Sequence, residues 1–286
     1  MPMKSRFTSL LLIAIGLVCT SDARAKCCVW KVTGPEGGML YLGGSFHALR
    51  PTDYPLPAAY NLAFDASSRI VFEEDLKAGR AAAKDLLKRG KYPKGDSLKN
   101  HIDPRTYDYL KRFFALYRVQ ESKFDSLRPW FLNIVLMAPP PQYSQLGVER
   151  FIERRALANS KPMIGLESTR EHYEVFAGLT DRENEASLLI LFINAGREKP
   201  EGQNAIDAWR TGDVEFLARL MHEGYRDFPS MGMRLLDDRN RNWVPKIEKY
   251  LHSGQTYFVV VGAGHMGGPN GLLALLKARG CKIEQL

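Results

Sequence analysis

Cysteine is scarce in this chain, with four among 286 residues. Cys19 lies in a leading segment that is treated separately below, which leaves Cys27, Cys28 and Cys281. No pair has the Cys-x-x-Cys spacing, so metal sites and dithiol redox centres of that type are excluded. Three cysteines are too few for a disulfide scaffold, and a chain of this length buries a full core without one. In an oxidising compartment one of Cys27 or Cys28 could still pair with Cys281.

Long apolar runs, internal repeats and low-complexity linkers are absent after residue 25. A helix needs about 20 apolar residues to cross a bilayer, so we expect no integral membrane segment in that part of the chain. The remaining length is within the usual range of α/β folds, and we expect a single domain over 26–286.

The first 25 residues have a different character. Two basic residues precede an apolar run that ends at Cys19, and an Ala-x-Ala site follows at 23–25. A basic start, a run too short to span a bilayer and this cleavage site indicate a secretory signal peptide over 1–25, with an uncleaved membrane anchor as the alternative. We therefore expect a secreted or periplasmic protein whose mature chain begins at about Lys26.

Positive charge is moderate and scattered. The formal net charge is +8, and it falls to +6 without residues 1–25, because three basic residues and one aspartate lie there. Basic patches such as 84–94 are diluted by aspartates. This distribution favours solubility and loose affinity for anionic surfaces, and it gives no argument for nucleic acid as a partner.

Apolar runs rich in β-branched and aromatic residues predict six strands. Helical periodicity fills most of the chain between the third and fifth of them. This alternation predicts an α/β fold with a central mixed, largely parallel sheet flanked by helices. The six expected strands are Cys27–Thr33, Met39–His47, Arg69–Phe72, Pro162–Leu166, Thr256–Val261 and Cys281–Leu286.

Two of these strands end in the same motif, Gly-x-x-His. It runs from Gly44 to His47 after the second strand and from Gly262 to His265 after the fifth. One match is weak evidence in a chain with 24 glycines and 6 histidines, but two matches that each follow a buried strand are harder to attribute to chance. Glycine lets the backbone turn sharply, so each imidazole is expected to point over the edge of the sheet.

Two other strands end in carboxylates. Glu73 follows the third strand with Glu74 and Asp75 next to it, and Glu167 follows the fourth. Adjacent carboxylates at the end of a buried strand repel one another unless a cation, a metal or solvent screens them. We expect Glu73 in the site, and the assignment between Glu73 and Glu74 stays open by one position.

Parallel strands place their C-terminal ends at one edge of a sheet, so His47, Glu73, Glu167 and His265 are expected to converge. Two imidazoles and two carboxylates suit divalent Zn, Mn, Co or Fe, and the absence of thiolate argues against Cu(I) and iron–sulfur clusters. A catalytic ion leaves a position for water, so one glutamate would be a ligand while the other acts as general base. Arg239 is a candidate to hold a substrate carboxylate or a developing oxyanion.

The ordered set of motifs resembles the TraB/PrgY/GumN family, which includes the animal TIKI proteins. The resemblance covers the chain from about Trp30 to Leu286 and is closest to the bacterial GumN-like members. It is carried by the two Gly-x-x-His motifs, the strand ending IVFEEDL, the segment from GVERF through KPMIGLES, the RNRNW segment, and VVVGAGHMGGPNGLLALLKARG.

This resemblance implies an α/β fold of the erythromycin-esterase and ChaN-like kind. Through the TIKI branch it implies a metalloprotease-like activity, peptide hydrolysis that depends on Mn or Co. The residues that match the family's motifs are His47, His265, Glu73 and Glu167. Arg239 and Asn240 match its Arg-Asn pair.

Three classes of function therefore stay open from the sequence. The first is a secreted metal-dependent hydrolase, with a peptide or protein as substrate. The second is a non-enzymatic periplasmic binding protein that uses the same cleft for a peptide, a polysaccharide or haem. The third is a purely structural site in which core hydrogen bonds satisfy both histidines. The sequence does not indicate an oligomeric state.

Overall fold

Six strands form one sheet in the computed structural model, which describes residues 26–196 and 201–286. The predicted signal peptide, 1–25, lies outside the described residues. The strands follow the order β4-β3-β5-β2-β1-β6 across the sheet. Their bounds are β1 Val29–Thr33, β2 Met39–Ser45, β3 Arg69–Glu74, β4 Met163–Glu167, β5 Tyr257–Gly262 and β6 Lys282–Gln285.

The four strands β4, β3, β5 and β2 run parallel to one another and form one half of the sheet. Their registers pair Glu74 with Glu167 and Ser45 with Gly262, so the four C-terminal ends meet at one edge. The prediction of a mixed, largely parallel sheet flanked by helices is confirmed. The central strand β5 is fully buried up to Val261, as expected for an apolar strand covered on both faces.

The other half of the sheet is antiparallel. A tight turn over residues 34–38 joins β1 to β2, and β6 pairs with the outer side of β1. This register places Trp30 opposite Gln285 and Thr33 opposite Lys282.

The disulfide considered from the sequence does not form. The antiparallel register puts Cys281 beside the far end of β1, whereas Cys27 and Cys28 precede its near end. All three cysteines are buried free thiols. The sequence left this pairing open, and the strand register keeps Cys281 away from both of the other cysteines, beyond the reach of a disulfide.

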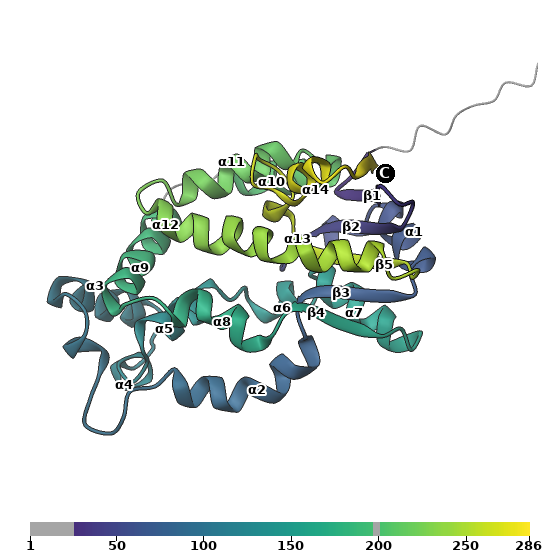
Figure 1. Cartoon of the computed structure of the whole chain (residues 1–286). Helices are drawn as coiled ribbons and strands as arrows, with labels where there is room; N and C mark the ends of the chain where they lie inside the picture. Colours follow the sequence, from purple (N-terminus) through teal and green to yellow (C-terminus); the bar gives the residue numbers. More distant parts are fainter. Residues whose placement is uncertain (1–25, 197–200) are drawn as a thin grey trace, which may run out of the picture.

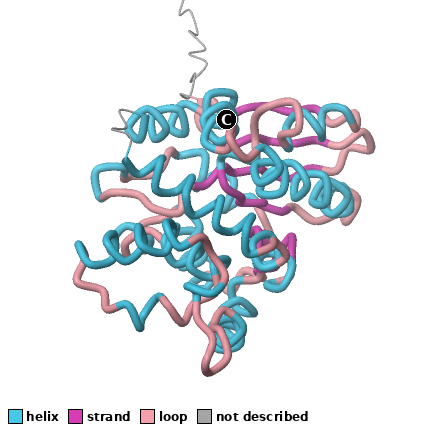
Figure 2. Tube along the Cα trace, turned by 90° about the vertical axis from the view of Figure 1, so that its left-hand side faces the viewer, coloured by secondary structure: helices cyan, strands magenta, loops and turns pink. Residues whose placement is uncertain are grey.

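Helices surround the sheet and extend away from it on one side (Figures 1 and 2). Short helical turns at Met233–Asp237 and Ala263–His265 matter for the site described below. The α-helices are α1 Ala58–Ala66, α2 Leu76–Arg89, α3 Pro104–Leu116, α4 Glu121–Phe124, α5 Pro129–Met137, α6 Pro141–Ser144, α7 Val148–Ala158, α8 Thr169–Ala177, α9 Asp181–Gly196, α10 Glu201–Thr211, α11 Val214–Gly224, α12 Pro229–Gly232, α13 Asp238–Leu251 and α14 Leu272–Ala278.

Helix α13 packs against both β2 and β4 and therefore crosses the parallel half of the sheet, in front of the strands in Figure 1. One face of α13 is buried, including Arg239, Asn240 and Trp243, whereas Arg241 is exposed. A π-helical turn, Met233–Asp237, leads directly into it. Such turns frequently occur at functional sites, because the extra residue changes the direction of the side chains that follow.

A separate apolar cluster lies in the helical part on the side of Figure 1 away from the sheet, around α3, α5 and α9. Helix α3 contributes Tyr107, Leu110 and Phe114 to this cluster, at helical spacing. Tyr117, three residues further on, is 67% exposed. It follows the end of α3, where the chain turns away through Arg118 in a left-handed conformation.

None of the helices in the described ranges is both long enough and apolar enough to cross a membrane.

Candidate functional site

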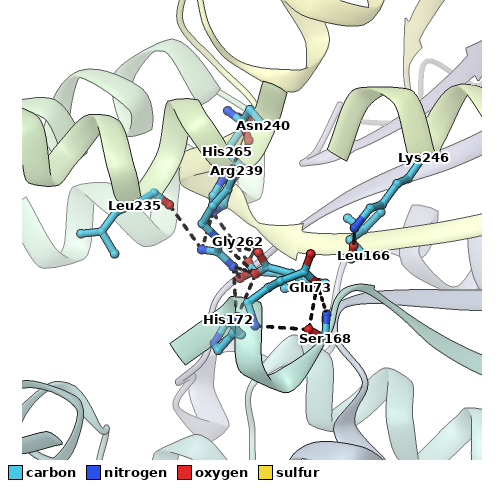
Figure 3. A network of polar contacts seen from close by, with 12 residues as sticks. Glu73, Leu166, Ser168, His172, Leu235, Arg239, Asn240, Lys246, Gly262 and His265 are labelled. Atoms are coloured by element: carbon cyan, nitrogen blue, oxygen red, sulfur yellow. Dashed lines mark hydrogen bonds and ion pairs between the residues drawn. The ribbon is translucent and has the colours of Figure 1, made fainter. Parts of the chain in front are cut away.

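The predicted strand-end residues gather around one cavity of about 410 Å³ at the C-terminal edge of the parallel strands. His47, Glu73, Arg239 and His265 all line it. Glu167 lies next to this wall and is joined to it through Arg239. Asn240 is buried behind His265 and contacts its ring. Figure 3 shows the groups around Arg239 and their polar contacts.

The alternation of side chains along β3 decides between Glu73 and Glu74. Glu73 faces the cavity, where its Oε1 accepts a 2.7 Å hydrogen bond from the Gly262 amide and its Oε2 one of 2.6 Å from Arg239 Nη2. Glu74 packs against α2, where a Cβ at Gly79 would lie 3.0 Å from its Oε2. Successive residues of a strand point to opposite faces, so only one of the two glutamates reaches the site.

The surroundings of Glu73 and Glu74 shift the pKa values of the two carboxylates in opposite directions. Burial alone would raise the pKa of Glu73, but Arg239 and then His265 hold it well below its ordinary value. Burial raises the pKa of Glu74, whose Oε2 has no partner among the described residues. The environment of Glu73 therefore favours the ionised form more strongly than that of Glu74, and an ionised carboxylate is the form that binds cations.

Arg239 is surrounded by acceptors on every side. Its Nε donates to Glu167 at 3.0 Å, and Nη2 contacts both glutamates. Nη1 lies 3.3 Å from the Leu235 carbonyl oxygen and 3.3 Å from His265 Nε2. A guanidinium has five N–H donors, and these contacts engage all of them. The geometry favours Arg239 as the buried counter-ion of Glu73 and Glu167 over a role in holding substrate.

His172 joins this cluster, although its sequence position gave no reason to select it. Its Nδ1 lies 3.0 Å from Glu167 Oε1 and 3.2 Å from Arg239 Nη2. Glu73, Glu167 and His172 offer ligand atoms within 4.8 Å of one another, a spacing that suits a metal ion. Arg239 Nη2 contacts each of the three residues, so the guanidinium already supplies the positive charge of this cluster.

His265 is held in one orientation by α13. Asn240 donates through Nδ2 to the carbonyl oxygens of Asn270 and His265, at 2.8 and 3.3 Å, so its Oδ1 is the acceptor for His265 Nδ1 at 2.8 Å. The ring packs on Trp243, 4.5 Å between centroids. Nε2 therefore carries the lone pair, 3.9 Å from Glu73 Oε1. Burial lowers the pKa of His265 to about 3, so the ring is neutral at physiological pH.

The His47 ring is also fixed through Nδ1, by Glu149 instead of an asparagine. Its Nδ1 lies 2.8 Å from Glu149 Oε1, which also accepts from Ser45 Oγ. Glu149 raises the pKa of His47 to about 9. Glu149 was not selected from the sequence, although it belongs to the GVERF segment. The only available signal was its position in the first turn of a helix, which is common for surface glutamates.

The buried charges of this region do not balance. Glu73, Glu167 and Glu149 have pKa values held below the ordinary value, and Arg239 is the guanidinium that contacts two of them. Arg239 and a His47 imidazolium, whose pKa is about 9, offset two of these three charges and leave one. A divalent cation that replaces the His47 proton would, together with Arg239, offset all three carboxylates, and two imidazoles and a carboxylate are donor types that Zn, Mn, Co and Fe accept in the divalent state.

The rest of the cavity wall is apolar. It is contributed mainly by α8 and α11, with Phe46 from the end of β2. The polar residues sit together at the sheet edge, so the cavity has one charged end and one apolar side. A pocket of this kind holds a ligand by apolar contact and orients it with few polar groups. Its apolar side chains include Val175, Phe176, Leu217, Leu220 and Met221.

Comparison with known proteins gives one match. The sequence profile described as the TraB/PrgY/gumN family matches residues 28–285, which is nearly the whole described chain. Searches of curated proteins and of solved structures found no match.

Proposed function

The chain belongs to the TraB/PrgY/gumN family, and from this and the cavity we propose a secreted or periplasmic metal-dependent hydrolase that cleaves peptide bonds. His47, Glu73 and His265 would hold the divalent ion, and His265 Nε2 would exchange its 3.3 Å contact with Arg239 Nη1 for that ion. Manganese or cobalt is the ion that the resemblance to TIKI proteins favours, with zinc or iron as alternatives.

The observation that carries this proposal is that the two histidines are fixed through the same ring nitrogen. Each ring has Nδ1 fixed by a side-chain oxygen from a helix, Asn240 for His265 and Glu149 for His47. Metal-binding histidines almost always have the second ring nitrogen fixed in this way, because it sets the tautomer and the direction of the first. Both residues line the same cavity as Glu73.

The residues around the proposed ion would each have a separate role. Glu73 is ionised and held by the Gly262 amide and by Arg239, which makes it a good ligand and a weak base. Arg239, which is itself paired with Glu167, fixes the position of Glu73 by charge pairing. The apolar side of the cavity would orient a substrate side chain and limit the access of bulk solvent to the charged end. A divalent ion bound there would supply an acidified water and polarise the scissile carbonyl.

Cleavage of a peptide library by the mature chain, 26–286, in the presence of Mn²⁺ or Co²⁺ tests this proposal. Mass spectrometry should detect products that disappear with chelator and with Glu73→Gln. Glu74→Gln is the matched control, because it makes the same chemical change one residue away on the opposite face of the strand, and it should retain cleavage. Equal cleavage by Glu73→Gln, or cleavage that chelators leave unchanged, would contradict the proposal.

The apolar side of the cavity also favours a second candidate, a binding protein for a peptide, a polysaccharide or haem without catalysis. This candidate predicts ligand binding that survives Glu73→Gln. The same variant therefore separates the two functions, by loss of cleavage in one case and retained binding in the other.

A further inference from the structure

Glu149 is a buried carboxylate outside the strand ends that supply the expected site residues. It lies in the first turn of α7, and its side chain is only 14% exposed. Its known contacts are directed toward the end of β2, to Ser45 and His47. The carboxylate therefore lies next to the cavity, in contact with one of the histidines that line it.

The start of α7 is fixed against the chain that carries His47. The Val148 amide donates to the Phe46 carbonyl oxygen at 3.0 Å. Gly147 precedes it, and a Cβ at that position would lie 2.4 Å from the His47 carbonyl oxygen. Only glycine allows this approach. The backbone of Gly147 and Val148 therefore packs directly on the backbone of Phe46 and His47, and this contact places the Glu149 carboxylate beside the imidazole.

His47 depends on Glu149 for its orientation. The His47 side chain is 69% exposed, and within the described ranges its ring has no other polar partner. An exposed imidazole without a partner moves among several rotamers. His265 does not depend on a single contact, because it is buried and packed on Trp243 as well as bonded to Asn240.

Ser45 fixes the carboxylate in turn. Its hydroxyl donates to Glu149 Oε1, the same oxygen that faces His47 Nδ1. Ser45 is itself buried at the last position of β2. The chain of contacts therefore runs from the sheet through Ser45 and Glu149 to the imidazole, and it leaves Nε2 as the free ring nitrogen of a residue that lines the cavity.

We propose that Glu149 is a positioning residue, which holds the His47 imidazole with Nε2 available to a divalent cation. The inference rests on the proposed metal site. Carboxylate partners of metal-binding histidines are worth about 10- to 100-fold in metal affinity.

Glu149→Gln tests the proposal, with Glu153→Gln as the matched control. Glu153 is on the same helix one turn later, has a side chain that is 7% exposed, and pairs with Arg80 and Arg150 instead of with the cavity. Calorimetric titration of the mature protein with Mn²⁺ should show affinity about 10- to 100-fold lower for Glu149→Gln. Glu153→Gln should bind like the wild type, and circular dichroism should show both variants folded.

A second readout does not require a metal. In nitrogen-15 spectra of the metal-free protein, the His47 Nδ1–H signal should be sharp and slow to exchange in the wild type and in Glu153→Gln. It should broaden or disappear in Glu149→Gln. A structural role of Glu149 alone would leave this signal unchanged in a folded variant.

The outcomes distinguish the positioning role of Glu149 from the existence of the metal site. Wild-type binding with unchanged affinity in Glu149→Gln would overturn the positioning role and leave the metal site standing. No Mn²⁺ binding by the wild type would remove the proposed metal function, and the positioning proposal would fall with it. An unchanged His47 signal in Glu149→Gln would overturn the positioning role in either case.

Discussion

Asn240 Oδ1 lies 2.8 Å from His265 Nδ1, deep beneath the cavity, and this contact fixes which nitrogen of the imidazole faces Glu73. The amide cannot rotate to offer its nitrogen, because Nδ2 already donates to two carbonyl oxygens. A side chain from a helix therefore sets the chemistry of a histidine that follows a strand.

Asn240→Asp should change the protonation of His265 without removing the acceptor. The new carboxylate is placed next to a ring whose pKa is about 3 because of burial, and a nearby negative charge favours the protonated form. The pKa of His265 should rise, as NMR titration of the ring in metal-free protein would detect. An unchanged pKa would mean that Asn240 does not face Nδ1.

Arg239→Gln should destabilise the fold strongly. Two buried carboxylates, Glu73 and Glu167, would lose their shared counter-ion. Removal of one partner from a buried ion pair costs about 3 to 5 kcal/mol in the free energy of unfolding. Urea unfolding measures the loss, and the double variant Arg239→Gln/Glu167→Gln should recover part of it. A loss within about 0.5 kcal/mol, the range of ordinary surface substitutions, would show that the network is solvated.

Acid should destabilise the metal-free protein between about pH 6.5 and pH 3. The unfolded chain takes up a proton at His265 near its ordinary pKa of 6.5, whereas the folded chain resists protonation until about 3. The unfolded state therefore binds more protons in this window, and the free energy of unfolding falls as the pH falls. The depressed pKa of Glu73 adds a loss in the same direction at the acid end.

Melting temperatures measured across this pH range test the expectation. His265→Gln should give a shallower decline between pH 6.5 and pH 4.5 than the wild type, since glutamine does not titrate. His252→Gln is the control, because His252 is an exposed histidine at the end of α13, and its decline should match the wild type. Parallel curves for all three proteins would contradict the buried, neutral assignment of His265.

Helix α2 should open more easily than the rest of the fold. It follows β3 directly but contains no buried residue. Its links to neighbouring helices include the ion pairs Arg80–Glu153 at 2.5 Å and Arg89–Glu174 at 2.9 Å. Both side chains of the Arg89–Glu174 pair and the arginine of the Arg80–Glu153 pair are exposed, and exposed ion pairs are weak and are screened by salt. Hydrogen exchange should be faster in α2 than in α13 and should increase with sodium chloride, whereas equal protection of both helices would contradict this.

The sheet and the strand-end residues could be predicted from sequence because both follow from local patterns. The run before Gly262 is apolar and β-branched, which only a buried strand explains well, and the parallel arrangement then brings Glu73 and His265 together. The boundaries were close as well, since the strand expected over Thr256–Val261 is Tyr257–Gly262 in the structure.

The helical contributions to the site could not be predicted in the same way. His172 and Glu149 lie on amphipathic helices, where a polar residue is usually exposed. Only tertiary packing turns them toward Glu167 and His47. The same limit applies to the role of Arg239, which was a candidate to hold a substrate carboxylate or an oxyanion. It lies in α13 and is buried where it pairs with Glu73 and Glu167.

Whether Cys27 or Cys28 pairs with Cys281 could not be predicted for a similar reason. Nothing in the spacing of Cys28 and Cys281 reveals that β6 runs antiparallel to β1 with Trp30 opposite Gln285. Register depends on contacts between distant strands, and a shift of pairing moves every side chain along the sheet.

The measurement that tests the metal proposal most directly is the metal content of purified mature protein, beside a His47→Ala/His265→Ala double variant. Elemental analysis should find Mn, Co, Zn or Fe at close to one ion per chain in the wild type. The double variant should lose it while remaining folded. If neither protein holds metal, even after incubation with Mn²⁺ and Co²⁺, the metal-dependent hydrolase is contradicted and the binding-protein function becomes the better explanation of the cavity.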